Sequence, residues 1–410
     1  MESRIQSRRW QSNLLFVFNL MGMIVLIGMA ILLALSNILT RLFAPSAELV
    51  DPSGNFLMAS ALVLVALLLI PGTVQSLRRI NNHFSPPHVI HPIRGWQIAA
   101  LVTAWLVAVV LSNVFYLMFD FGWIISIPFY LASIALPVGG LLWVALGGLP
   151  LGSRQRNWGT FSIAMLGGPS LAGAVEVLFY LAFVMLMVFM LLMRPDWQAA
   201  ANQLSEQLAN APSLDVILEI FSPIVLNPVV VLGLLAVLAG LVPLVEEAIK
   251  PLVVILLGKR LENPVDGFVL GAISGAGFAF VEGLLAASNT SEGWGVLLAA
   301  RAAGSLMHIT TSAIFGWGLV AARQQKRFLL LAGTYFSAVI LHGLWNASAV
   351  ILAIGSLRIV LSEMPSDLLG IVMIITGVAG MGLLTVAMLT VLPMVNHRLR
   401  PKPVGSEIDV

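Results

Sequence analysis

The sequence predicts an all-α polytopic membrane protein, a transmembrane helical bundle of about ten spans. Of its 410 residues, 59% are hydrophobic and only 10% are charged, and the mean hydropathy is +0.99, far above that of soluble globular domains. Apolar stretches of about 20 residues recur along the chain, and each is long enough to cross a hydrocarbon core of about 30 Å. Because these stretches are continuous and do not alternate with polar residues, they exclude a transmembrane β-barrel.

Ten apolar segments follow one another along the chain. The first, 14–35, is longer than the apolar core of a signal peptide, so we expect an uncleaved span there. The segment 224–258 is longer than one crossing needs, and Pro228, Pro243 and Pro251 predict a kinked or broken helix within it. The predicted spans lie near 14–35, 56–77, 96–119, 123–147, 170–193, 224–258, 264–290, 296–322, 328–352 and 367–393.

The distribution of polar residues suggests three regions. We expect an N-terminal transmembrane region at 1–220, with about five spans and an extracytoplasmic insert at 194–222. The apolar residues of that insert recur at helical spacing, which predicts an amphipathic helix outside the bilayer. A core at 221–352 holds nearly all the polar residues inside predicted spans, and a C-terminal span with its tail occupies 353–410.

Basic residues predict the orientation in the membrane. Sixteen Lys and Arg residues fall on one side of the predicted map and three on the other, so the positive-inside rule places both termini in the cytoplasm. The first side comprises the N-terminus, the loops at 78–95, 148–169, 259–263 and 323–327, and the C-terminal tail. The opposite side holds only Arg41, Arg194 and Arg358.

Three glutamates stand inside the apolar segments of the core. Glu246 and Glu247 are adjacent, Lys250 follows within one helical turn, and Glu282 lies near the end of the next span. An ionisable side chain at the centre of a membrane helix costs at least ~2.5 kcal/mol, so such residues need a partner or a function. Since residues four apart share a helical face, Lys250 can neutralise Glu246. These carboxylates are the strongest functional signal in the chain.

Two further spans supply imidazoles. His308 lies seven residues after Arg301 and His342 lies four residues before Asn346, so each pair shares a helical face. Counted from the basic clusters at 1.5 Å per residue, Glu247 and both histidines lie roughly 18–23 Å from the cytoplasmic edge. Glu282 lies at about 27 Å on the same measure, a difference that helix tilt can remove. We therefore expect four helices to bring these groups together.

The residue types allow two kinds of hydrolytic chemistry. Two imidazoles and a carboxylate can hold zinc with one position open for water, and a further glutamate can then act as general base. A Glu–His pair can also activate water without a metal. The chain has no cysteine, which excludes thiolate catalysis and cysteine ligands.

Four motifs in separate spans resemble a known family. EEAIK, FAFVE, a lone HITTSAIFG and HGLWN are similar to the PrsW family of intramembrane proteases, distantly related to the type II CAAX prenyl proteases and the bacteriocin-processing (CPBP) membrane proteases. The resemblance covers about 241–348. Glu282 stands where the CAAX-type relatives carry histidine, which favours the PrsW branch.

The resemblance implies a function and a set of residues. By this resemblance Glu246, Glu247, Glu282, His308 and His342 become the catalytic candidates, with Asn346 supporting them. From the residues themselves we expect Lys250 and Arg301 as further supporting residues, and Glu282, His308 and His342, the His₂Glu set of catalytic zinc sites, as the candidate zinc ligands. The resemblance implies an intramembrane peptidase in a prokaryotic-type plasma membrane, acting on a membrane-bound protein such as an anti-sigma factor. The expected partners are this substrate and the lipid bilayer, and we expect no nucleic-acid partner.

Other interpretations remain open on the sequence alone. HExxH, the YD and GxGD pair, and a rhomboid GxSG are all absent, which argues against the other intramembrane protease classes. A proton- or cation-coupled transporter or channel could use the same carboxylates. A non-catalytic membrane scaffold could retain the core residues. A hydrolase needs the glutamates and histidines around one water-accessible site, whereas a transporter needs acids along a path.

Overall fold

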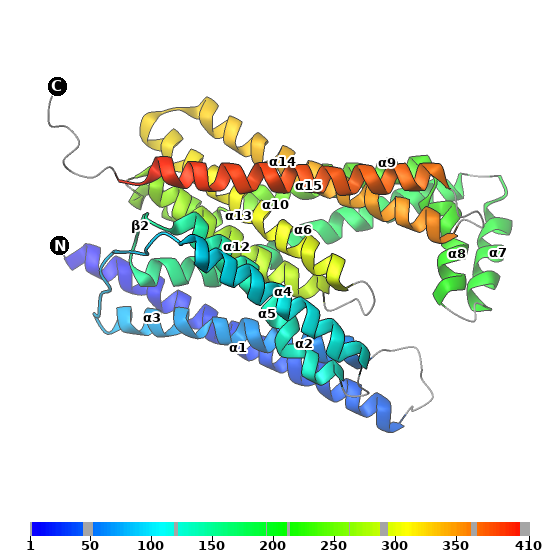
Figure 1. The fold of residues 1–410 in the computed structure, drawn as a ribbon, viewed down its shortest axis with the longest axis horizontal. Coiled ribbons are helices and arrows are strands. Elements are labelled where there is room, and N and C mark those ends of the chain that lie inside the picture. Colours follow the sequence, from blue (N-terminus) through cyan, green and yellow to red (C-terminus); the bar gives the residue numbers. More distant parts are fainter. Residues whose placement is uncertain are drawn as a thin grey trace. The chain divides into compact units, whose positions relative to one another are not determined.

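The computed structural model describes residues 2–43, 52–118, 122–193, 195–210, 214–261, 263–287, 294–361 and 367–401. The described chain consists of helices with one short two-stranded sheet (Figure 1). In order, the elements are α1 (Glu2–Phe43), α2 (Pro52–Leu68), α3 (Ile70–Ile80), β1 (His88–Val89), α4 (Gly95–Met118), α5 (Gly122–Leu146), β2 (Pro150–Leu151), α6 (Arg154–Leu192), α7 (Trp197–Ala209), α8 (Leu214–Val225), α9 (Pro228–Leu235), the π-helical turn η1 (Ala236–Leu241), α10 (Val242–Ile249), α11 (Leu252–Leu257), the 3-10 turn η2 (Gly258–Arg260), α12 (Pro264–Ala287), α13 (Trp294–Gln325), α14 (Phe328–Leu361) and α15 (Leu368–Leu399).

Within the described residues, ten helical segments are long and apolar enough to cross a membrane. They confirm the predicted all-α polytopic bundle and its number of spans. The predicted cytoplasmic loop at 148–169 is wrong for most of its length, because α6 begins at Arg154 and runs through it. The apolar residues of this stretch pack inside the protein, where Ala164 and Met165 are buried, and Pro169 is accommodated within the helix.

The chain divides into two units. The first unit comprises Met1–Pro169, Lys250–Tyr335 and Met388–Val410. The second unit comprises Ser170–Ile249 and Phe336–Ala387. Helices α6, α14 and α15 each contribute to both units. The sequence-based division at 220 and 352 stays a prediction.

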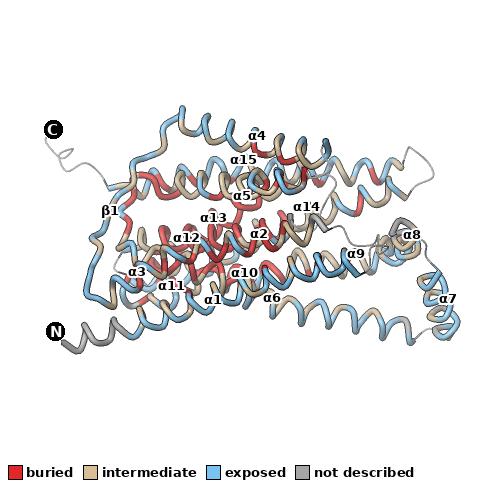
Figure 2. Tube along the Cα trace, turned by 90° about the horizontal axis from the view of Figure 1, so that it is seen from below, coloured by how far each residue is buried: buried red, intermediate tan, exposed pale blue. Residues whose placement is uncertain are grey.

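The core of the first unit is the pair of helices α12 and α13. In each of them, 83% of the most apolar 18-residue window is buried, and Figure 2 shows both helices largely in red. A ladder of glycines lets the two backbones meet: a Cβ on Gly267, Gly271 or Gly275 would collide with a backbone carbonyl of α13. Small residues repeated at this four-residue spacing favour such close helix packing.

Helix α5 packs against this pair. Tyr130 of α5 is fully buried, and its hydroxyl donates a hydrogen bond to the backbone carbonyl of Leu284 at 2.8 Å. Next to α5, β1 and β2 pair antiparallel, with His88 opposite Leu151. The pair joins the segment before α4 to the segment before α6, so it ties two inter-helix connections together at one end of the unit.

The second unit contains the polar insert that the sequence places at 194–222. The prediction of one amphipathic helix is only partly right, because two helices form, α7 and α8. Helix α7 ends at Ala209, and the residue that follows, Asn210, caps it with a side-chain hydrogen bond to the carbonyl of Glu206. Arg194 and residues 211–213 lie outside the described residues.

The predicted broken helix at 224–258 is confirmed. Pro228 is the first residue of α9, where a missing N–H costs nothing, and Asn227 caps it by accepting from the N–H of Val229 at 2.9 Å. After the π-helical turn η1, α10 runs only to Ile249. Pro251 separates α10 from α11, because proline cannot continue the backbone hydrogen-bond pattern.

Candidate functional site

Two adjacent glutamates lie on the buried side of α10. Val242, Pro243, Glu246 and Glu247 are the buried residues of this helix, whereas Leu244 is exposed. The spacing of three and four residues between these positions places them on one face of a helix. The Glu247 side chain is 0% exposed and that of Glu246 is 8% exposed. Sequence reasoning located both residues, and the structure places them inside the protein.

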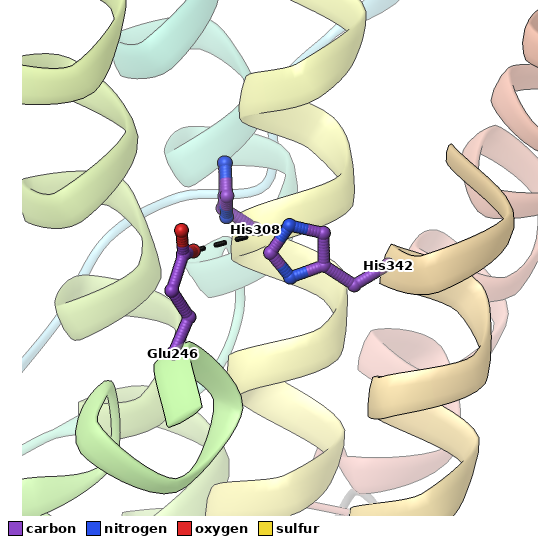
Figure 3. Close-up of side chains that lie close together, drawn as sticks. All are labelled: Glu246, His308 and His342. Atoms are coloured by element: carbon purple, nitrogen blue, oxygen red, sulfur yellow. Dashed lines mark ion pairs between the residues drawn. The ribbon is translucent and has the colours of Figure 1, made fainter. Parts of the chain in front are cut away.

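His342 of α14 contacts both glutamates, one through each ring nitrogen. Its Nδ1 lies 2.9 Å from Oε1 of Glu247, a hydrogen-bond distance. Its Nε2 lies 3.9 Å from Oε2 of Glu246, the ion pair drawn as a dashed line in Figure 3. A carboxylate beside Nδ1 selects the tautomer in which Nδ1 carries the hydrogen, so Nε2 keeps its lone pair on the side of Glu246.

The distance between Glu246 and His342 has a chemical consequence. At 3.9 Å the two atoms are too far apart for a direct hydrogen bond, and a group placed beside both can interact with each. The arrangement of Glu247, His342 and Glu246 therefore orients one imidazole and leaves its other nitrogen next to a carboxylate. All three residues lie within the second unit.

Asn346 lies one turn after His342 on α14. Its Nδ2 donates a hydrogen bond to the backbone carbonyl of Leu238, in the π-helical turn before α10, at 2.8 Å. Between them on the helix, Gly343 lies so close to η1 that an added Cβ would stand 2.5 Å from the carbonyl oxygen of Ala239. The sequence suggested an assisting role for Asn346, but it gave no signal for the contact with η1.

A second group of ionisable residues lies between α12 and α13 in the first unit. Nε2 of His308 is 2.6 Å from Oε2 of Glu282, and Nη1 of Arg301 is 2.8 Å from Oε1 of the same carboxylate. Both oxygens of Glu282 are thus engaged by nitrogen groups. Arg301 and His308 share a face of α13, as their spacing of seven predicts, and the glycine ladder brings that face to Glu282.

Lys250 lies in the turn between α10 and α11 and is buried. Its Nζ stands 4.7 Å from the centre of the Phe278 ring, a cation–π contact, and the Phe278 ring in turn lies 5.4 Å from that of His308. The hydroxyl of Ser274 donates to the Lys250 backbone carbonyl. This carbonyl lies at the helix break, so the hydroxyl supplies a donor where the backbone pattern is interrupted.

The comparison with family models decides the kind of protein. Residues 212–381, about two fifths of the chain, match the model described as PrsW family intramembrane metalloprotease. This region is similar to the PrsW family. No curated protein and no solved structure matches the chain. The matched region contains α9 to α14, every predicted catalytic residue and the polar core, and it identifies the chain as an intramembrane protease, a peptide hydrolase.

The PrsW family is described as metalloproteases, so the donor set is tested against a metal. Within the second unit, Glu246 and His342, two of the side chains labelled in Figure 3, offer a carboxylate and an imidazole. Zinc binds both donor types at about 2.0–2.2 Å, so the 3.9 Å between His342 Nε2 and Glu246 Oε2 is within the span of two such bonds. The bond from Nδ1 to Glu247 is the orienting contact that metal-binding histidines usually make. The chemistry of these donors fits a metal ion.

Proposed function

We propose that this chain hydrolyses a peptide bond in or beside the membrane-spanning segment of a substrate protein, using a water molecule activated by Glu246. The observation that carries the proposal is the buried row of Glu247, His342 and Glu246, in which one imidazole contacts both carboxylates at 2.9 and 3.9 Å. Buried carboxylates beside an oriented imidazole are the groups that general acid–base catalysis requires.

The proposed roles follow from the contacts. Glu247 holds His342 in one tautomer and orientation. Glu246 accepts a proton from the attacking water, and this proton then passes through Nε2 of His342 to the nitrogen of the leaving amine as the peptide bond breaks. The Glu282 carboxylate is already engaged on both oxygens by His308 and Arg301, so we assign it to positioning His308 and not to the base.

We further propose a zinc-bound form of this site as the alternative to these proton-transfer roles. In that form the Nε2 of His342 and the carboxylate of Glu246 would hold the ion and would not carry protons. The support is the family description and the donor chemistry. The sequence-based ligand set of Glu282, His308 and His342 is the alternative. A bound zinc ion would lower the pKa of water and polarise the scissile carbonyl. A metal-free Glu–His mechanism predicts that activity survives chelation.

The substrate and the orientation are also proposals. The resemblance of the motifs suggests a membrane-bound regulatory protein of the anti-sigma-factor type as the substrate. The sixteen basic residues on one side of the predicted map support both termini in the cytoplasm, and the family resemblance suggests a prokaryotic-type plasma membrane.

The test compares matched glutamate variants of the purified protein in liposomes. Native membrane proteins are added, and new peptide termini are counted by mass spectrometry. Glu246→Gln should lower the cleavage rate by about 10²–10⁴-fold, the usual contribution of a general base. Glu247→Gln should lower it by about 10–100-fold, as expected for a group that orients another. Glu206→Gln, on the exposed surface of α7, is the control. Wild-type rates in both core variants would refute the proposal.

A further inference from the structure

A π-helical turn stands directly before the helix that carries the two glutamates. In η1, the N–H of Val242 donates to the carbonyl of Val237, five residues earlier instead of four. Such a turn accommodates one extra residue. Since each residue of an α-helix turns by about 100°, one extra residue changes which side chains of α10 face a given neighbour. The register of η1 therefore decides where Glu246 and Glu247 point.

This register leaves one carbonyl without a backbone donor. If the N–H of Val242 goes to Val237, the corresponding donor for Leu238 would be residue 243. That residue is Pro243, which has no N–H. The Nδ2 of Asn346 supplies the missing hydrogen bond at 2.8 Å. Where a membrane-spanning segment is shielded from water, an unpaired carbonyl has no substitute donor and would disfavour the π-helical turn.

Gly343 makes this hydrogen bond possible. An added Cβ would lie 2.5 Å from the carbonyl oxygen of Ala239, closer than real Cβ contacts come. Only glycine lets the backbone of α14 lie against η1 at this point. Asn346 follows three residues later and His342 precedes directly, so one short stretch of α14 touches both η1 and Glu247.

We propose that Gly343, Asn346 and Pro243 form a register lock that stabilises η1 and thereby directs Glu246 and Glu247 toward His342. In this assignment Asn346 is a positioning residue that acts through the backbone of Leu238 and does not touch the substrate. The inference rests on the proposed peptidase function for its activity readout, but the lock itself is a property of the second unit alone.

The decisive experiment is a double-variant cycle. Asn346→Ala removes the donor to Leu238 and should lower kcat by about 10–100-fold with little change in KM. The reason is that Glu246 and Glu247 would no longer point toward His342, whereas the contacts with the substrate would persist. Pro243→Ala restores a backbone N–H at the position that lacks it. We expect Pro243→Ala alone to stay near the wild-type rate, and the double variant to recover most of the activity lost in Asn346→Ala.

Two further variants complete the design. Ser356→Ala removes another side-chain hydrogen bond of α14, one that returns to the helix's own backbone at Leu352, and it should leave kcat unchanged. Gly343→Ala should reproduce the kcat loss of Asn346→Ala, and Pro243→Ala should not rescue it, because the defect there is steric. If Asn346 instead contacts the substrate, Pro243→Ala will fail to rescue Asn346→Ala, and that result overturns the lock.

Unfolding midpoints of the same variants in detergent provide a readout that does not depend on peptidase activity. The lock predicts a lower midpoint for Asn346→Ala and a midpoint restored toward wild type in the double variant. Strictly additive midpoints at positions 243 and 346 would overturn it. A wild-type protein that cleaves nothing, but shows this coupling, would refute the proposed function and keep the lock.

Discussion

Replacing Gly275 by alanine tests whether the backbone contact between α12 and α13 positions His308. A Cβ at Gly275 would stand 2.8 Å from the carbonyl carbon of His308 and 2.9 Å from the Cα of Ile309, whereas ordinary contact begins at 3.4 Å. The colliding atoms are backbone, so no side-chain rotation can relieve the collision. The two helices must separate by about 0.5 Å or more at this point, and His308 moves with the backbone that is displaced.

The expected magnitude follows from this displacement. Overpacking of this kind costs about 1–3 kcal/mol, and a gap of about 0.5–1 Å between neighbouring atoms already removes a quarter to a half of their dispersion attraction. Alanine regains about 0.5–1 kcal/mol through its better helix propensity. We therefore expect a net loss of about 1–2 kcal/mol. The 2.6 Å contact between His308 and Glu282 should lengthen, and cleavage activity should fall with it.

The matched control is Gly139→Ala in α5 of the same unit, where nothing lies within 4 Å of an added Cβ. That variant should be neutral or more stable by up to about 1 kcal/mol. Both variants are compared by thermal unfolding in detergent and by cleavage rate in liposomes. Equal midpoints and equal rates for the two variants would refute the reasoning, because they would show that the α12–α13 contact does not constrain His308.

Three further outcomes are expected. Arg301→Met removes the cation beside Glu282 and should lower the cleavage rate about 10-fold or more, whereas Arg301→Lys should retain part of the activity. A fully active Arg301→Met variant would show that the ion pair is dispensable. The hydrogen bond from Arg358 holds the pKa of Asp367 below its usual value. The stabilisation from this carboxylate is therefore full above about pH 4 and declines as the pH falls through the lowered pKa. Asp367→Asn should abolish this acid-dependent shift of the unfolding midpoint, and an unchanged shift would contradict the assignment. Because the natural chain has no cysteine, Ser205→Cys introduces a single thiol, which should react with a membrane-impermeant thiol reagent added outside intact cells. Protection of this thiol would reverse the proposed orientation.

The spans could be predicted from the sequence because each depends on a local property, about 20 consecutive apolar residues. The exception, α6, shows the limit of that property. Its first part, including Arg154 and Arg156, is polar enough to resemble a loop, yet it forms helix because residues such as Met165 find partners inside the fold. Tertiary burial of this kind leaves no mark on the local hydropathy.

Pairings within one helix or between adjacent helices were also predictable in part. The seven-residue spacing of Arg301 and His308 correctly places both on one face, and the glycine spacing indicates close approach to α12. The pairing of Lys250 with Glu246 that the four-residue spacing predicts stays a prediction. Pro251 ends α10 at Ile249, and the Lys250 side chain lies over the Phe278 ring.

The contact between Glu247 and His342 could not be derived from spacing, since 95 residues separate them. It depends on the register of η1, which in turn depends on a backbone N–H that Pro243 lacks and an amide that Asn346 supplies. Each of these residues is visible in the sequence as a common helix-breaking or polar residue. Their relation appears only when the hydrogen-bond pattern of the turn is known.

The two carboxylate–histidine contacts differ in a way that separates their roles. Glu282 is held by an arginine on one oxygen and by His308 on the other, at 2.8 and 2.6 Å, so the charge on this carboxylate is matched and its geometry fixed. The Glu246 oxygen stands 3.9 Å from the His342 nitrogen, beyond direct hydrogen bonding, and an attacking water needs that separation in order to contact both groups. A carboxylate fixed by a guanidinium is suited to hold an imidazole, whereas a carboxylate set back from an oriented imidazole is suited to take a proton. On this contrast we propose Glu246 as the general base and Glu282 as the anchor of His308.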